Sequence, residues 1–163
     1  MVRLQTYICC FLLVLIFPSL TFADFSGRVV GVTDGDTITV LHNGRGEKIR
    51  LYGIDCPEKR QAFGTKAKQF TSQLAFGQDV TVKEHGQDKY HRTLGEVILP
   101  DGKSLNDELV YNGLAWWYRK YSKSPRLAAF EMEARLAHRG LWADKDPVPP
   151  WCWRKQVKGQ VCK

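Results

Sequence analysis

Five charged residues of this sequence have the types and spacing that phosphate chemistry needs. Asp34 and Asp36 lie in one glycine-containing turn, and Asp55 and Glu58 lie in a proline-containing one. Arg50 precedes the second turn by a few residues. Carboxylates gathered beside an arginine are costly unless a hard cation and an anionic ligand balance their charge. The residues therefore suggest a site for a divalent cation and an anion.

Two β-rich runs must position these acids. The runs cover residues 37–41 and 48–54, and turn-forming residues 42–46 join them. If the runs pair as an antiparallel hairpin, the start of the first lies beside the end of the second. Asp36 and Asp55 then meet at one end of the sheet, although 18 residues separate them. Ile49 and Leu51 point to the core, so Arg50 faces a surface or cleft.

Hydrolysis of a phosphodiester would use each of these groups. The fork of an arginine donates to two phosphate oxygens at once. A divalent cation polarises the phosphate and lowers the pKa of a bound water, and a carboxylate takes the proton of that water. Asp36 and Asp55 are hard oxygen donors suited to Ca²⁺, with a backbone carbonyl and waters completing its shell. Arg92, at the start of a later strand, is a second candidate for binding phosphate.

The remaining elements predict an α+β protein that is mainly β. Short strands are expected at residues 25–32, around residues 80–82 and at residues 94–99, with a polar loop at 84–91. Apolar stripes predict a helix before Gly77, a second from Ser104 to Gly113 with a capping box, and a third from Ser124 to about Gly140. Five strands with a helix inserted after the third predict a five-stranded Greek-key barrel of the OB type with about three flanking helices.

Length and composition restrict the class of protein. The 163 residues support one domain, and 44% apolar content argues against disorder. The net charge of +7 favours a polyanionic partner such as nucleic acid, although a merely basic protein is the simpler alternative. Neither a C-x-x-C pair nor a histidine-rich pattern is present, which argues against zinc.

The chain divides into three segments. Residues 1–23 predict a secretory signal peptide cleaved after Ala23, which would place the protein in the periplasm or outside the cell; an uncleaved membrane anchor is the alternative. Residues 24–143 form the predicted barrel domain, and residues 144–163 form a Pro-, Trp- and Lys-rich tail expected to be irregular. Cleavage would leave a net charge of +6. The mature protein is expected to have no stable membrane association and to be a monomer.

Three cysteines follow the predicted cleavage site. Cys152 and Cys162 could close a short loop in the tail, worth roughly 2–3 kcal/mol in an oxidising compartment. Cys56 could instead pair with one of them. The sequence does not choose between these pairings.

Each motif is weak alone, but their combination resembles a known family. DGDT, IRLYGIDCPE, DKYHR and LNDELVYNGLA occur in the order typical of the staphylococcal nuclease (thermonuclease) family. The resemblance covers residues 27–142. It implies an OB-fold, Ca²⁺-dependent endonuclease that cuts DNA and RNA with little sequence specificity and leaves 3′-phosphate ends.

The resemblance also assigns roles by position. Asp36 and Asp55 correspond to the Ca²⁺ carboxylate ligands, and Cys56 corresponds to a residue that supplies a backbone carbonyl ligand. The predicted catalytic residues are Arg50, Glu58 and Arg92, with Asp34 as an acid supporting the ligands. Predicted substrate contacts are Lys89, Tyr90, Tyr118 and Tyr121. Two departures stand out: Cys56 replaces the usual Thr or Ala, and His91 replaces a glycine that often precedes the second arginine.

Two non-catalytic functions are alternatives. An OB-fold nucleic-acid-binding module would keep a basic groove but would not need the acids. An envelope interaction domain could use the tail segment 151–155 for docking and would need none of the charged residues. The presence of all five charged positions favours the nuclease.

Overall fold

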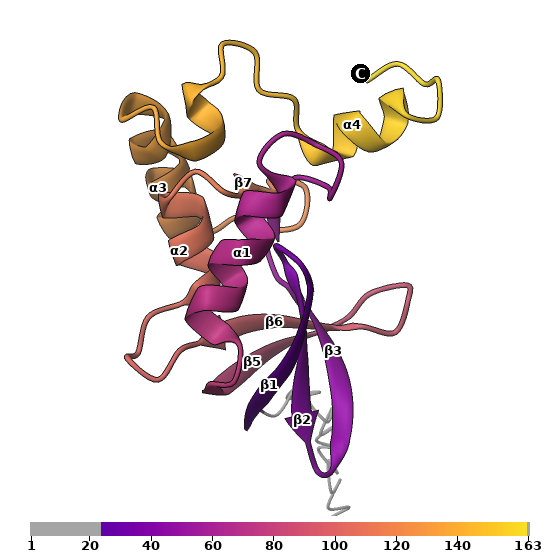
Figure 1. The fold of residues 1–163 in the computed structure, drawn as a ribbon, viewed down its shortest axis with the longest axis vertical. Helices are drawn as coiled ribbons and strands as arrows, with labels where there is room; N and C mark the ends of the chain where they lie inside the picture. The colour runs from indigo at the N-terminus through magenta and orange to yellow at the C-terminus, as the bar shows by residue number, and fades with distance from the viewer. Residues whose placement is uncertain (1–23, 163) are drawn as a thin grey trace, which may run out of the picture.

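The fold is a closed barrel of five strands with helices packed beside it (Figure 1). A computed structural model describes residues 24–162, so the predicted signal peptide lies outside the described residues. The barrel strands follow one another in space as β1-β2-β3-β6-β5. Their bounds are β1 Phe25–Asp34, β2 Thr37–His42, β3 Arg45–Leu51, β5 Asp79–Gln87 and β6 Thr93–Ile98. This confirms the predicted OB-type barrel and the α+β class.

The hairpin that carries the acids forms as predicted, with a tighter turn. β2 and β3 pair antiparallel, and the register places Thr37 opposite Arg50 and Ile38 opposite Ile49. The turn needs only Asn43 and Gly44, both with positive φ (49° and 75°), which is the two-residue connection that Asn-Gly favours. The start of β2 and the end of β3 therefore lie side by side.

The barrel closes through strands that are distant in the sequence. β3 pairs parallel with β6, and β5 pairs antiparallel with both β6 and β1. A Cβ at Gly95 would lie 2.7 Å from Val82 Cγ1 and 3.0 Å from Ile49 Cγ2, so only glycine lets these strands approach so closely. β5 continues to Gln87, which corrects the prediction of a loop beginning at Glu84.

The three expected helices are present: α1 (Gly64–Ala75), α2 (Leu105–Tyr111) and α3 (Pro125–Leu136). α1 packs against β1, α2 packs against α1 and β6, and α3 packs against α2. Ser104 caps α2 by accepting a hydrogen bond from the Asp107 amide, as the capping box predicts. Ser124 caps α3 in the same way. α3 ends earlier than the apolar stripe suggested, because His138 and Gly140 adopt positive φ and start the 3₁₀ turn η1 (Gly140–Ala143).

The tail differs from the expectation of irregular structure. It contains a fourth helix, α4 (Pro150–Gln156), which the yellow segment of Figure 1 shows beside the loop that follows β4 (Ile54–Asp55). Pro150 stands at its first turn, where a missing N–H costs nothing. A disulfide joins Cys152 to Cys162, and Cys56 stays free and buried. Between residues 24 and 162, every helix is too short or too polar to cross a bilayer.

Candidate active site

The first acidic turn lies between β1 and β2 and packs tightly against α1. Asp34 Oδ1 accepts a hydrogen bond from the Asp36 amide at 3.3 Å, which stabilises the turn. Thr71 of α1 donates to the Gly35 carbonyl at 2.6 Å. Asp34 therefore supports Asp36 through the backbone, consistent with its predicted role.

Gly35 leaves no room for a side chain. A Cβ there would lie 2.8 Å from the Ala67 Cβ and 2.9 Å from both the Cβ and the Sγ of Cys56. We therefore expect Gly35→Ala to lower the free energy of unfolding by about 1–3 kcal/mol, the usual cost of overpacking, as measured by urea denaturation. Gly31→Ala is the matched control, because its Cβ would meet Thr39 at an ordinary 3.5 Å. Equal stability of the two variants would contradict this packing argument.

The second acidic turn follows β4, which pairs with β7 (Trp116–Trp117) and places Asp55 opposite Trp116. β7 is held in turn by α3, where the buried Glu131 accepts a hydrogen bond from the Trp117 amide and pairs with Arg119. This small sheet fixes the backbone of Asp55.

A direct hydrogen bond joins the two turns. The Cys56 amide donates to Asp36 Oδ2 at 2.6 Å. Burial raises the pKa of the Cys56 thiol well above its ordinary value, so the thiol stays protonated and acts as core packing. Cys56 is thus tolerated at a position where only its backbone is predicted to bind a cation.

Arg50 joins the two carboxylates. Its Nη1 pairs with Asp36 Oδ1, and its Nη2 lies 2.7 Å from Asp55 Oδ1. The side chain of Asp55 is 1% exposed and that of Arg50 is 14% exposed, so the contacts are shielded from water. Two carboxylates share this guanidinium. The predicted convergence of Asp36, Asp55 and Arg50 is present in the structure.

The donors at the two acidic turns are of the kind that calcium prefers. Among residues 24–162, no three Asp, Glu, His or Cys side chains form a cluster that could hold a metal. Asp36 and Asp55 would give Ca²⁺ two carboxylates, so the ion would need further oxygens, such as the Cys56 carbonyl and waters. All of these donors are hard oxygens, which favours Ca²⁺ over a softer metal.

Glu58 follows Asp55 by three residues in the second acidic turn. Its amide donates to Gln61 Oε1 at 3.1 Å, and its side chain is 41% exposed. The carboxylate contacts an arginine that sequence reasoning missed: Arg154 of α4, whose Nη1 lies 2.7 Å from Glu58 Oε1. Arg154 also contacts Asp55, with Nη2 2.7 Å from Oδ2. Burial lowers the pKa of the Arg154 guanidinium, but its hydrogen bonds to these two acids outweigh burial and raise it.

Arg92 pairs with an acid of its own loop, Asp88. It lies just before β6, which runs beside β3 with Thr93 opposite Ile49. Its Nε and Nη2 pair with Asp88 Oδ2 at 2.8 and 2.7 Å. Burial raises the pKa of the Asp88 carboxyl, but hydrogen bonds from Arg92 and nearby amides outweigh burial and lower it. In the described part of the chain the contacts of Arg92 are with its own loop, so the structure does not join it to Asp36 or Asp55.

His91 keeps the backbone conformation that its position requires. Its φ is 59°, a left-handed value that glycine adopts freely and that histidine adopts more often than most residues. Histidine therefore occupies this position with a backbone conformation that also suits glycine.

The predicted substrate contacts fall into two groups. Lys89 and Tyr90 lie in the Arg92 loop, where the Lys89 ammonium and the Arg92 guanidinium both lie over the Tyr90 ring. Tyr118 and Tyr121 contact each other edge to face, with ring centroids 4.8 Å apart. Burial raises the pKa of the Tyr118 hydroxyl, and the nearby Asp55 carboxylate adds to the rise.

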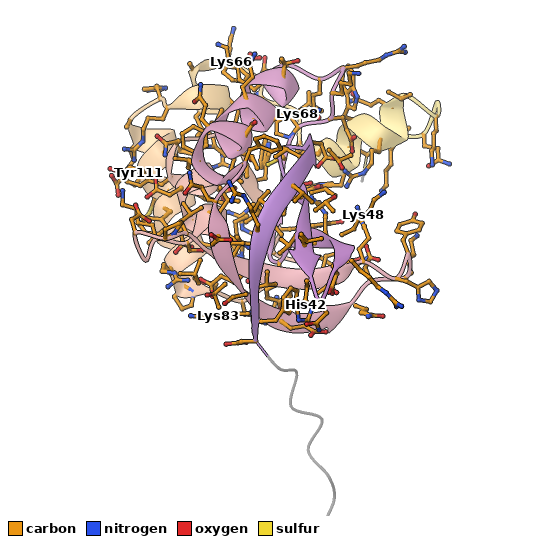
Figure 2. All side chains as sticks on the ribbon, turned by 60° about the horizontal axis from the view of Figure 1, so that its bottom comes forward. His42, Lys48, Lys66, Lys68, Lys83 and Tyr111 are labelled. Atoms are coloured by element: carbon orange, nitrogen blue, oxygen red, sulfur yellow. A yellow bond between two sulfur atoms is a disulfide. The ribbon has the colours of Figure 1, made fainter. Side chains whose placement is uncertain are left out.

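Basic residues are spread over the molecule rather than gathered on one element. Figure 2 labels Lys48 on β3, Lys66 and Lys68 on α1 and Lys83 on β5. This distribution suits non-specific attraction of a polyanion better than recognition of one sequence.

The sequence of this chain is similar to those of known nucleases. A family model described as "Staphylococcal nuclease homologue" matches residues 48–144. An uncharacterized endonuclease of Escherichia coli O157:H7 is 44% identical, and the match covers 93% of this chain and 98% of the relative. A micrococcal nuclease of Shigella flexneri is 43% identical over 89% of each chain. Protein ParB of Escherichia coli is 40% identical over 89% of this chain and 88% of its own length. The chain belongs to the staphylococcal nuclease family.

Proposed function

We propose that this nuclease is a Ca²⁺-dependent endonuclease that hydrolyses DNA and RNA with little sequence specificity and leaves 3′-phosphate ends. The observation that carries the proposal is the pairing of Asp36 and Asp55 with one guanidinium, that of Arg50. The printed names of the relatives support nuclease activity. Export with cleavage after Ala23 is part of the proposal, and N-terminal sequencing of the mature protein should then begin at Asp24.

In the proposed mechanism each residue has one task. Asp36, Asp55 and the Cys56 carbonyl would hold Ca²⁺, which when bound polarises the phosphate and lowers the pKa of a water. Glu58 takes a proton from the attacking water, and its exposure allows water to reach it. Arg50 donates to the phosphate and stabilises the charge that grows on its oxygens as the P–O5′ bond breaks.

Arg92 would supply the second guanidinium. Its pair with Asp88 uses the Nε edge, and the group has further N–H donors for a phosphate oxygen. Because the structure leaves Arg92 in its own loop, its role depends on the substrate reaching that loop. Lys89 and Tyr90 lie beside it and would contact the same strand of nucleic acid.

Degradation of plasmid DNA tests the cation requirement and the cleavage chemistry together. With Ca²⁺ the supercoiled form should become open circles, linear molecules and then fragments, whereas excess EGTA should stop the reaction. A polymerase should extend the products only after a phosphatase removes their 3′-phosphates. Equal degradation in excess chelator would contradict the calcium requirement, and products that extend without phosphatase would contradict the predicted ends.

A further inference from the structure

Arg154 binds the same two acids that the proposed mechanism needs. Its Nη2 lies 2.7 Å from Asp55 Oδ2, and its Nη1 lies 3.3 Å from Asp55 Oδ1 and 2.7 Å from Glu58 Oε1. The guanidinium fork thus bridges a predicted cation ligand and the predicted general base. Charge-assisted pairs of this geometry are among the stronger hydrogen bonds in proteins.

These contacts leave Asp55 without a free oxygen. Oδ1 accepts from both Arg50 and Arg154, Oδ2 accepts from Arg154, and the side chain is 1% exposed. Oδ2 keeps one lone pair, but a cation there would lie beside two guanidinium groups, which repel it. A cation that binds Asp55 therefore competes with Arg50 and Arg154.

Arg154 is the arginine that can move. Arg50 is 14% exposed, lies on a barrel strand with a neighbour on either side, and also pairs with Asp36. Arg154 is 41% exposed and belongs to a seven-residue helix near the end of the chain. Arg154 is therefore held less firmly than Arg50.

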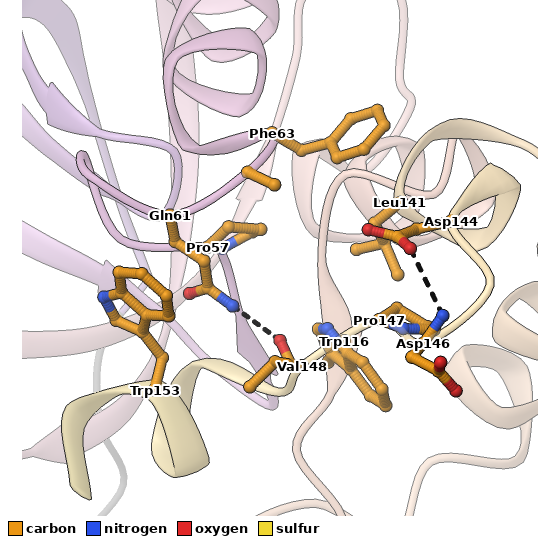
Figure 3. A pocket seen from close by; sticks show the side chains of 11 residues that line it. Pro57, Gln61, Phe63, Trp116, Leu141, Asp144, Asp146, Pro147, Val148 and Trp153 are labelled. Atoms are coloured by element: carbon orange, nitrogen blue, oxygen red, sulfur yellow. Dashed lines mark hydrogen bonds between the residues drawn. The ribbon is translucent and has the colours of Figure 1, made fainter. Parts of the chain in front are cut away.

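The tail is held at the surface of the body. Gln61 donates to the Val148 carbonyl, and Figure 3 shows this bond at the edge of a pocket that Trp153 and Pro57 also line. Trp151 stacks on Tyr118 with ring centroids 5.0 Å apart and meets Trp116 edge to face at 5.6 Å. Of the residues of α4, only Pro150 is buried, so the helix is held less firmly than the barrel strands.

The charge of the segment 150–162 is opposite to that of the acidic site. Residues 150–162 contain three basic residues and no acidic one: Arg154, Lys155 and Lys158. Without Arg154, the cluster of Asp36, Asp55 and Glu58 would have Arg50 alone to balance three carboxylates. The tail therefore supplies the cation that the acids lack when no metal is bound.

We propose that the segment 150–162 is an intramolecular competitor of Ca²⁺: Arg154 holds Asp55 and Glu58 until the ion displaces it. The inference rests on the proposed function, since it takes Asp55 as a calcium ligand. While the tail is docked, the cation site is closed, Glu58 is engaged and one face of Tyr118 is covered by Trp151. Calcium binding opens all three, so the tail raises the calcium concentration at which the nuclease becomes active.

Calorimetric titration of Ca²⁺ into the purified protein without nucleic acid tests this inference. Arg154→Gln should bind Ca²⁺ about tenfold to a hundredfold more tightly than the wild type, the range expected from losing charge-assisted competing bonds. Arg154→Lys keeps the charge but not the fork and should fall between them. Lys155→Gln is the matched control: it removes the same charge from the neighbouring position and should bind within twofold of the wild type.

A fourth variant separates the inference from the proposed function. Asp55→Asn should lose calcium binding. If it does while Arg154→Gln binds no more tightly than the wild type, the calcium site stands and the competition by the tail is overturned. If Asp55→Asn takes up Ca²⁺ as the wild type does, the proposed site is wrong and the inference falls with it. If Arg154→Gln and Lys155→Gln tightened calcium binding equally, the gain would come from removing any nearby positive charge. That result would also overturn the inference.

Discussion

Replacement of Arg50 by alanine is expected to lower the rate of phosphodiester cleavage by about a thousandfold or more, the range seen when an arginine that stabilises a phosphoryl transition state is lost. Arg50 is the group that joins Asp36 and Asp55 and would meet the phosphate. Its removal takes away charge stabilisation that develops only in the transition state. The loss should therefore appear in single-turnover rates at saturating Ca²⁺ and DNA.

Two further variants make this result specific. Arg50→Lys keeps the positive charge between the acids but lacks the planar fork, so it should remain at least about a hundredfold slower than the wild type. Arg45→Ala removes an arginine from the exposed far end of the same strand and should cut at a normal rate. Circular dichroism checks that each variant is folded. Near-normal cleavage by Arg50→Lys would show that a point charge suffices and would refute the bidentate role.

The Glu58→Gln variant is expected to lose about a hundredfold to ten-thousandfold in turnover, the usual contribution of a general base. Glutamine keeps the size of the side chain and an oxygen that can accept a hydrogen bond from Arg154, so the loop should keep its structure. It cannot take a proton from water. The measurement is kcat for cleavage of a short oligonucleotide at saturating Ca²⁺.

Glu133→Gln is the control for this substitution. Glu133 is an exposed acid on α3 that pairs with Arg139, away from the two acidic turns. Its variant should cleave the oligonucleotide at the wild-type rate. If Glu58→Gln also turned over normally, another group would have to take the proton, and the proposed mechanism would lose its base.

Much of the site could be predicted because it depends on local patterns. The β-branched run before Asn43-Gly44 and the alternation after it predict a hairpin, whose register places Thr37, the neighbour of Asp36, opposite Arg50. The buried positions of Ile49 and Leu51 follow from the same alternation and turn Arg50 out of the core. The capping of α2 by Ser104 is likewise a local signal.

Other features have no local signal. Asp55 is fixed by its pairing with β7, about sixty residues later in the chain. Arg92 pairs with Asp88 rather than with Asp36 or Asp55. The helix in the tail was missed because Pro, Trp and Cys dominate its first turn and favour irregular structure by composition. The pairing of Cys152 with Cys162 was one of several possibilities until the fold placed Cys56 in the core.

The amino-acid pattern alone determined the strands and the hairpin that brings Asp36 beside Arg50, because periodicity and turn chemistry act between near neighbours. Closure of the barrel and the position of Asp55 depend on strands that are distant in the sequence. Only the tertiary structure decided that Arg154 reaches Asp55 across 99 positions and Glu58 across 96. Contacts at that separation depend on how the helices and the tail pack over the barrel, and no spacing in the sequence encodes which arginine will meet a buried carboxylate.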